Sequence, residues 1–337
     1  MKSTIRKHPM RKGVTLRDIA REVGVNTPTV SKALRGGSDL SAETVNRIRE
    51  TAARMGYRVR ERKNAAVRTV AIICPELMGS YYARVATQLY EKLRAAGYEV
   101  KLAVSDFDQT REEALLMNFA GKGAAGLVCV TENDLAQAVT RIPRSVPTVV
   151  IAANFTSAER DVICVDENIG MRAVADHLAG LGHTRIAYAG SPYGETRRRY
   201  LAEALASHSI TLDAYVSEKR HGACGYELGQ RILAAVPRPT AVAAEYDDIA
   251  LGLMRAFSEA GLRVPEDISV TGFDDADFCR YLPVSLTSVN SHVPALCTLA
   301  VDMLTRKLAD PAYRVVQSTY IKPTLSVRES TGKCFEI

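Results

Sequence analysis

The sequence predicts an α/β core of two lobes with a small all-α module in front of it, and three observations support this fold class. The chain has 337 residues, a length that suits two or three domains. Apolar residues recur at helical spacing near the N-terminus, whereas from Val70 onward short apolar runs alternate with helical patterns. This alternation is typical of parallel sheets that helices cover on both faces. A hydrophobic content of 47% suffices for a large core and excludes a wholly disordered chain.

Charge is distributed unevenly along the chain. Residues 1–69 contain 17 Lys and Arg against 6 Asp and Glu, whereas the remaining residues contain 27 against 32. A strongly basic end on a mildly acidic body is typical of a protein that binds a polyanion. A solvated charged tail is the alternative, but such a tail lacks the apolar periodicity that this segment has.

The basic segment begins with a predicted short helix. Thr15 and Asp18 have the spacing of a capping box, and Gly24 is a typical helix end. One face of the helix would consist of Leu16, Ile19, Ala20 and Val23, which follow the i, i+3, i+4, i+7 pattern.

Two further helices follow in the same segment. The second starts at Asn26 or Thr27 as the cap, has Pro28 in its first turn, and ends at Gly36-Gly37. Ser41 caps the third, which ends near Gly56. The inward positions would be Val30, Ala33 and Leu34 on the second helix and Val45, Ile48, Ala52 and Met55 on the third. Two helices joined by a tight turn, with a third closing the core, form a helix-turn-helix pattern.

The order and spacing of these motifs resemble the N-terminal domain of LacI-type (LacI/GalR family) transcriptional regulators. The resemblance rests on residues 15–20, 23–25, 29–34 and 55–57. It implies a double-stranded DNA operator as partner, with the start of the second helix in the major groove. Thr27, Pro28 and Lys32 stand where the family contacts base edges, although Thr27 could instead be a simple N-cap. The full predicted set of DNA-contacting residues is Thr15, Asn26, Thr27, Pro28, Thr29, Ser31, Lys32, Arg58 and Arg60.

A basic linker, residues 58–69, is expected between a helix-turn-helix domain at 1–57 and an effector-binding domain at 70–337. The resembled family places a Pro-Asn pair and an Ala-Arg-x-Leu hinge helix here. This chain has neither that Pro nor that Leu, but it keeps five basic residues between Arg58 and Arg68. Attraction to the DNA backbone and insertion of Arg into the minor groove are therefore expected, without a Leu wedge. A solvated linker that is ordered only on DNA is the open alternative.

The larger part of the chain contains predicted strands and helices in alternation. The strands are expected at residues 70–74, 100–104, 126–130, 148–151, 185–189, 240–244 and 268–272. The helices are expected at residues 82–96, 112–121, 171–181, 197–207, 225–235 and 249–261. About a dozen elements exceed a single sheet, and two lobes with ligands at the carboxyl ends of buried parallel strands are expected.

The resemblance extends over this part as well. It rests on residues 163–166, 177–183, 286–289 and 323–330, and most strongly on Val264–Asp275. It implies a two-lobed, periplasmic-binding-protein-like core, a ligand cleft between the lobes, and a homodimer. The first lobe would span about 70–165 and 293–323, and the second about 166–292 and 324–337.

Five residues are candidates for holding an effector in that cleft. Arg197 has the spacing of the family's cleft arginine, and Asp274 follows a predicted strand; together they offer a donor and an acceptor for a sugar-like polyol. A structural ion pair or N-cap is the alternative for these two. Tyr81 and Tyr82 offer flat faces to a ring, or they pack the lobe. Tyr246 would narrow the cleft, because the family usually has a smaller residue there.

Several classes of protein are disfavoured. No run of 18 apolar residues occurs, and the basic N-terminus leads into no apolar signal segment, so a cytoplasmic protein is expected. Seven scattered cysteines without a C-x-x-C pair suggest reduced thiols. The G-x-G-x-x-G run at 121–126 ends a predicted helix instead of opening one, which predicts a turn and not a dinucleotide site.

No catalytic, metal-binding or cofactor-binding pattern is found, and no enzymatic activity, metal or cofactor is expected. The sequence therefore predicts an effector-responsive transcriptional regulator, in the first place a repressor. The alternative is a sugar-binding or sugar-modifying α/β protein without a DNA-binding role.

Overall fold

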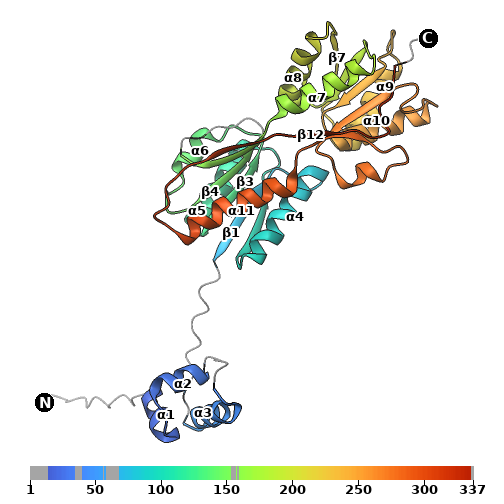
Figure 1. The fold of residues 1–337 in the computed structure, drawn as a ribbon. Helices are drawn as coiled ribbons and strands as arrows, with labels where there is room; N and C mark the ends of the chain where they lie inside the picture. The colour runs from blue at the N-terminus through green and yellow to red at the C-terminus, as the bar shows by residue number, and fades with distance from the viewer. Residues whose placement is uncertain are drawn as a thin grey trace, which may run out of the picture. The chain divides into compact units, whose positions relative to one another are not determined.

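A computed structural model describes residues 14–34, 40–55, 57, 68–152, 157 and 159–334, and the chain divides into two compact units, Met1–Ala66 and Val67–Ile337 (Figure 1). The predicted helix stops at Gly36-Gly37 and Gly56 lie outside the described residues. Arg58, Arg60 and nearly all of the predicted linker lie outside them too.

The first unit is the predicted module of three helices, α1 (Leu16–Val23), α2 (Thr27–Leu34) and α3 (Ala42–Arg54). Its buried core consists of Ile19, Ala20, Val23, Val30, Ala33, Ile48 and Ala52. The remaining predicted inward residues, Leu16, Leu34, Val45 and Met55, pack against this core but stay half-buried. The apolar faces of the three helices therefore pack against one another, as the helical periodicity predicts.

Local hydrogen bonds fix the ends of these helices. Thr15 Oγ1 accepts from Asp18 N, and Asp18 Oδ2 accepts from Thr15 N at 2.9 Å, which is the predicted capping box. Gly24 ends α1 with φ 73°, a left-handed conformation that glycine adopts without a Cβ penalty. Ser41 caps α3 through Thr44 N. These three predictions of helix ends are confirmed.

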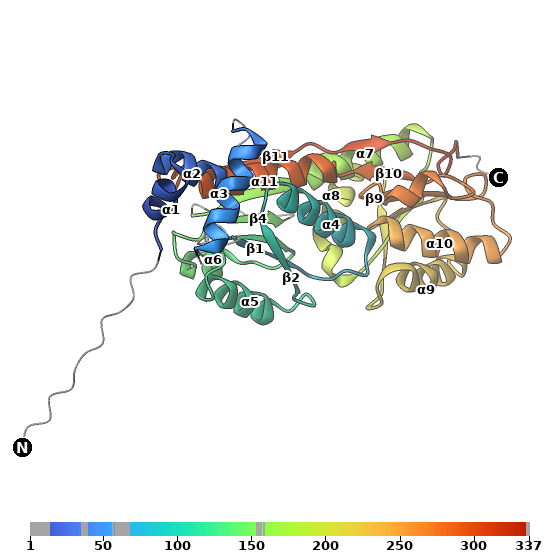
Figure 2. The same cartoon turned by 90° about the horizontal axis from the view of Figure 1, so that it is seen from below.

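The second unit contains two sheets, and the first has the strand order β11-β5-β4-β3-β1-β2 with parallel pairing throughout. Its strands are β1 (Thr69–Cys74), β2 (Glu99–Val104), β3 (Gly126–Thr131), β4 (Thr148–Ala152), β5 (Asp161–Val165) and β11 (Ser318–Ile321). Helices α4 (Ser80–Ala95) and α11 (Val293–Ala309) lie side by side on one face (Figures 1 and 2). Helices α5 (Gln109–Gly121) and α6 (Ala136–Arg141) cover the other face.

The second sheet has the order β12-β10-β9-β8-β6-β7, and only its edge pair β10–β12 is antiparallel. Its strands are β6 (Ile186–Gly190), β7 (Leu212–Val216), β8 (Ala241–Ala244), β9 (Ser269–Phe273), β10 (Thr287–Asn290) and β12 (Thr324–Ser326). Helices α7 (Glu167–Gly180) and α8 (Glu195–Ala206) pack on one face, and α9 (His221–Leu233) and α10 (Asp247–Glu259) on the other. Short 3₁₀ turns are found at Pro192–Gly194 and Asp277–Arg280.

Side chains alternate between the two faces of each sheet. On β1, Val70, Ile72 and Cys74 belong to the core under α4 and α11, whereas Ala71 and Ile73 belong to the core under α5 and α6. A parallel strand that is buried on both faces is apolar at every position, which explains why it was predictable as a continuous apolar run.

The chain passes from one sheet to the other after β5, after β10 and after β11. The carboxyl ends of the parallel strands of both sheets therefore border one region between the two lobes (Figure 2). In a doubly wound sheet, ligands bind outside these ends where the strand order reverses, here between β1 and β3 and between β6 and β8.

Helices α9 and α10 approach each other closely on the second sheet. A Cβ built on Gly225 would overlap the carbonyl oxygen of Ile249, and one built on Gly252 would overlap the carbonyl oxygen of Gly222. Glycine therefore allows backbone-to-backbone packing here. This packing fixes the N-terminal ends of both helices relative to each other at the edge of the region between the lobes.

The predicted fold class is confirmed, but some predicted elements differ. Residues 100–104 were predicted to form a buried strand, whereas β2 is an edge strand that is half exposed because it pairs only with β1. The prediction missed α6, α11, β5, β7, β10, β11 and β12. Several of these strands are short or exposed and lack a continuous apolar run. None of the helices in the described ranges combines the length and apolar character needed to cross a bilayer.

Candidate functional site

The start of α2 is built around Asn26. Its Oδ1 accepts hydrogen bonds from Thr29 N at 2.8 Å and from Thr29 Oγ1 at 2.5 Å. Asn26 is therefore the N-cap, and the alternative that Thr27 is the cap is wrong, since Thr27 is the first helical residue. Pro28 follows in the first turn, where the absence of an N–H costs nothing.

The outer face of α2 carries the predicted DNA-contacting side chains. Asn26, Pro28 and Lys32 are exposed, and Thr27, Thr29 and Ser31 are half-buried, while Val30 and Ala33 anchor the helix in the core. Thr15 is exposed, but its hydroxyl takes part in the α1 capping box. The helix thus presents hydroxyls, an amine and its own N-terminal N–H groups on one face, a combination that suits phosphates and base edges.

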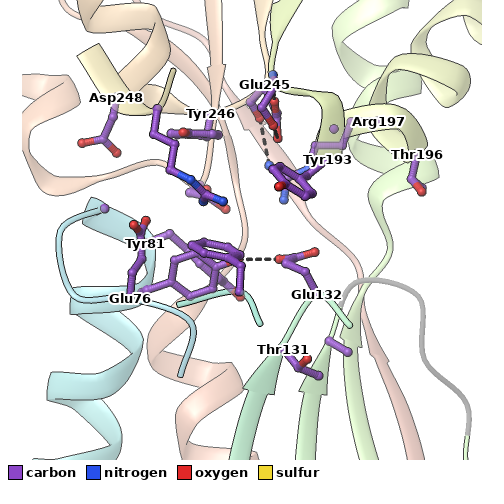
Figure 3. A pocket seen from close by; sticks show the side chains of 18 of the residues that line it. Glu76, Tyr81, Thr131, Glu132, Tyr193, Thr196, Arg197, Glu245, Tyr246 and Asp248 are labelled. Carbon is purple, nitrogen blue, oxygen red and sulfur yellow. Dashed lines mark hydrogen bonds between the residues drawn. The ribbon is translucent and has the colours of Figure 1, made fainter. Parts of the chain in front are cut away.

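A second site lies between the two lobes, in a cavity of about 290 Å³ (Figure 3). Its lining comes from segments that follow strands of both sheets, including the turns after β1 and β3 and those after β6 and β8. This is the position that the reversal of strand order favours. All five predicted effector residues, Tyr81, Tyr82, Arg197, Tyr246 and Asp274, line this cavity.

Aromatic rings form one part of the cavity wall. Tyr81 and Tyr82 meet edge to face with their ring centres 5.2 Å apart, and Tyr82 meets Phe107 in the same way at 5.7 Å. Phe107 of the first lobe stacks with Tyr193 of the second at 6.4 Å. The guanidinium of Arg220 lies 3.6 Å from the ring centre of Phe107. The wall therefore offers flat apolar faces as well as a place where a cation is held against a ring.

Arg197 is held in place by the protein. Its Nε donates to Glu167 Oε1 at 2.6 Å, its Nη1 donates to the carbonyl oxygen of Glu245 at 2.8 Å, and its guanidinium lies 3.9 Å from the ring centre of Phe273. Burial by itself would lower the pKa of Arg197, but the carboxylates around it, first Glu167, raise it, so the side chain stays charged. Arg197 is thus a cleft residue and also a member of a buried ion pair.

Asp274 follows β9 directly, with φ 98°, and its Oδ1 accepts from Ser291 Oγ at 2.8 Å. Burial raises the pKa of this carboxyl, whereas Arg197 and Ser291 oppose the shift. Tyr246 immediately precedes α10, and its hydroxyl oxygen accepts from His221 N at 3.1 Å. Tyr246 therefore fills space at the edge of the cleft, as its size predicts.

Apart from Asp274, sequence reasoning missed the acidic residues of the cleft. Glu132 follows β3, and its Oε1 accepts from Tyr82 Oη at 2.7 Å. The side chain stays accessible from the cleft, yet the protein around it removes part of its hydration; this loss and the carboxylates of Glu167 and Glu245 raise its pKa to about 7. Glu245 follows β8 and accepts from the N–H and hydroxyl of Ser191. The signal that located Asp274, a polar residue after a buried strand, would also have located these two.

Polar contacts join the lobes across the cleft. His221 Nε2 lies 3.2 Å from Glu76 Oε2, and Ser80 Oγ donates to Asp248 Oδ2 at 2.5 Å. Arg84 donates to the carbonyl oxygen of Asp275 at 2.9 Å. Each pair joins a residue of the first lobe to one of the second, and the structure therefore has the lobes closed against each other.

Other predicted features have plain structural roles. The glycine run at 121–126 lies where α5 ends and β3 begins, with Gly123 at φ 81°, so the prediction of a turn is confirmed. All seven cysteines are free thiols, as expected. In the described ranges, no group of three or more His, Cys, Asp or Glu side chains is arranged to hold a metal ion.

Comparison with known proteins agrees with this architecture. Residues 15–59 match the family described as bacterial regulatory proteins, lacI family, and residues 175–331 match the periplasmic binding protein-like domain. The HTH-type transcriptional regulator MalR of Streptomyces coelicolor is 30% identical over 335 residues, which cover 94% of this chain and 96% of that protein. The chain belongs to the LacI family of bacterial regulatory proteins. As a member of the LacI family it is a DNA-binding transcriptional regulator and not an enzyme.

Solved structures of LacI-family proteins share the fold. The lac repressor dimer bound to operator and an anti-inducer is 23% identical, with a TM-score of 0.72 over 95% of this chain and 100% of that one. A LacI family regulator of Enterococcus faecium with bound ribose is 22% identical, with a TM-score of 0.72 over 80% of this chain and 100% of that one. At this level of identity the likeness shows the fold.

Proposed function

We propose that this LacI-family protein is a repressor that binds a double-stranded DNA operator as a homodimer and a carbohydrate-like effector in its interlobe cleft. The cleft carries the proposal: a cavity of about 290 Å³ at the carboxyl ends of both sheets, with aromatic faces, hydrogen-bond donors and acceptors on its wall. A cavity of this size accommodates a ligand of one or two sugar rings, at the lower end of ordinary ligand pockets. An operator as partner also predicts a cytoplasmic location.

Carbohydrates combine apolar ring faces with hydroxyl groups, and the cleft offers partners for both. Tyr81 and Tyr82 supply ring surface, and the Asp274 carboxyl supplies an acceptor. The solved structure of the E. faecium relative contains ribose, which supports a carbohydrate effector for this chain as well.

For the DNA-binding unit we propose that α2 enters the major groove, with Thr27, Pro28 and Lys32 at base edges and Thr29, Ser31 and the helix N-terminus at phosphates. Lysine lacks the rigid fork of arginine, and base selection by Lys32 is therefore expected to be looser than with Arg at that position. We keep 1–57, 58–69 and 70–337 as the proposed domain bounds, and 165/166, 292/293 and 323/324 as the proposed lobe crossovers.

Linkage explains how the effector would act. A ligand shifts an equilibrium only by its differential affinity for the two states. An effector that contacts both lobes binds the closed form more tightly, and closure would change the spacing of the two helix-turn-helix units of the dimer. Without the usual hinge-helix sequence, this spacing is the proposed route of coupling.

A gel-shift experiment with DNA from upstream of the gene tests the proposal. The full chain should prefer one duplex by about 10³-fold over unrelated DNA, with affinity falling steeply as salt rises. Lys32→Gln should weaken this binding, whereas Lys122→Gln, at an exposed turn after α5, should not. Asp274→Asn should leave operator binding intact and abolish the effector response. Affinity without sequence preference would instead favour a sugar-binding α/β protein with no operator.

A further inference from the structure

The charge of the cleft is strongly unbalanced. Among the described lining residues there are seven Asp and Glu side chains against two Arg and one His. Both arginines already have partners within the protein, Arg197 in its ion pair with Glu167 and Arg220 against the ring of Phe107. The cavity is therefore negative, and an incoming phosphate or carboxylate would meet more repulsion than attraction.

Most of the acidic side chains in the cleft have a partner in the protein. Glu76 pairs with His221, Asp248 accepts from Ser80, and Asp274 accepts from Ser291. The first two contacts cross between the lobes and the third lies within the second lobe, and these groups do not by themselves require a ligand.

Glu132 differs from these residues. Its side chain is exposed to the cleft, whereas Glu76 and Asp248 are half-buried and Asp274 is buried. Its hydrogen-bond donor is the neutral hydroxyl of Tyr82, and within the described ranges it forms no ion pair with a Lys, Arg or His side chain. Figure 3 shows it within the cavity beside the aromatic side chains. Loss of hydration and the nearby carboxylate of Glu167 raise its pKa, and the opposing effects of the Tyr82 hydroxyl and of Arg197, which is already paired with Glu167, do not cancel this shift.

The aromatic wall independently favours a cation. The guanidinium of Arg220 lies 3.6 Å from the ring centre of Phe107 and 5.2 Å from that of Tyr193, so the protein already places a positive group against these rings. Tyr82 contacts Phe107 edge to face and donates to Glu132. A second cation beside Glu132 would thus have a carboxylate and the aromatic side chain of Tyr82 as neighbours.

We propose that the effector is a cationic polyol, an amine-bearing sugar of one or two rings, and that Glu132 receives its ammonium group. This inference rests on the proposed function, because it specifies the chemistry of the effector in the same cleft. The aromatic faces and Asp274 would hold the ring and its hydroxyls, while Glu132 would select for the charge.

Calorimetric titration of the full chain with matched sugars tests the proposal. Three sets of three compounds would be compared at neutral pH. The first set consists of glucosamine, glucose and glucose 6-phosphate, and the other two consist of the corresponding galactose and mannose compounds. In at least one set the amine should bind about tenfold more tightly than its neutral parent, as expected for a hydrogen bond between charged groups, and the phosphate should bind most weakly.

Two variants show whether Glu132 is responsible. Glu132→Gln should lower the affinity for the amine to about that for the neutral parent, and continued binding of the neutral parent would show that the cleft is intact. Glu203→Gln removes a carboxylate from the exposed face of α8 and should keep the preference.

The outcomes separate this inference from the proposed function. Equal or tighter binding of a neutral or phosphorylated sugar overturns the cationic ligand but leaves a carbohydrate effector standing. A preference for the amine that survives Glu132→Gln overturns the role of Glu132. Binding of none of the nine compounds counts against both the amine and the carbohydrate effector, whereas operator binding is judged separately by gel shift.

Discussion

The ion pair of Arg197 and Glu167 gives the sharpest test of how the cleft is built. The Glu167 side chain is 5% exposed and that of Arg197 is 16% exposed, and their nitrogen and oxygen lie 2.6 Å apart. Arg197→Met keeps much of the side-chain volume but leaves the Glu167 carboxylate unpaired near other acids. Removing one partner of a buried pair typically costs about 3–5 kcal/mol. Because the cleft admits water, we expect the lower end, about 3 kcal/mol.

Replacing the unpaired Glu167 carboxylate by a neutral amide should restore part of the stability that Arg197→Met loses. Glu167→Gln alone keeps a hydrogen-bond acceptor for Arg197 and should cost about 1–2 kcal/mol. In the double variant neither charge remains. Its loss in free energy of unfolding should therefore be smaller than the sum of the losses of the two single variants, by at least about 1.5 kcal/mol. Urea denaturation followed by circular dichroism measures all four free energies of unfolding, if the slope with urea stays constant among them.

Two results would refute this reasoning. One is an Arg197→Met protein as stable as the wild type, which would mean that Glu167 is well hydrated or neutral. The other is strict additivity in the double variant, which would mean that the two side chains do not interact in solution. The same set of variants is also a control for effector binding, because an Arg197 variant can lose its effector response through the loss of this ion pair alone.

Three other predictions concern the helix ends, the helix packing and the contact between lobes. Asn26→Ala should remove the α2 cap, destabilise the first unit by about 1 kcal/mol and weaken operator binding in a gel shift. Asn26→Asp should keep the cap and the stability, but its added carboxylate should weaken operator binding through repulsion by the DNA phosphates. Gly225→Ala should lower the free energy of unfolding by about 3 kcal/mol or more through overlap with the α10 backbone. Gly180→Ala, at a helix end with open space, should be neutral or stabilising by up to about 0.5 kcal/mol. Equal effects of the two substitutions would contradict the close packing of α9 against α10. The hydrogen bond with Glu76 raises the pKa of His221, so the stabilisation should be complete below the ordinary pKa of 6.5 and lost as pH rises through the raised value. The difference in melting temperature between wild type and His221→Gln should therefore be largest near pH 6 and shrink with rising pH, and a constant difference would exclude this contact as a source of stability.

Much of the fold could be predicted because its signals are local. The capping box of Thr15 and Asp18 and the left-handed Gly24 are set by residues within a few positions of one another. A central strand such as β1 is apolar at nearly every position because helices cover both of its faces. Strand β2 lacks this constraint at the sheet edge, and its exposure could not be inferred from its own residues.

The candidate site was only partly predictable. Spacing and strand ends indicated Arg197 and Asp274, and both line the cleft. The partner of Arg197, however, is Glu167, which starts a helix 30 positions earlier in the chain. That contact depends on how α7 and α8 pack on the second sheet, and no local pattern encodes it.

By itself the sequence determined that the chain has a helix-turn-helix unit followed by an alternating α/β unit, because caps, periodicity and charge distribution are properties of neighbouring residues. Only the tertiary structure decided which side chains share the cleft. Glu132 and Glu245 follow strands of different sheets and meet the same cavity because the chain crosses between the lobes. Their charge state then depends on hydration and on neighbouring charges, and both are fixed by distance in space and not by separation in sequence.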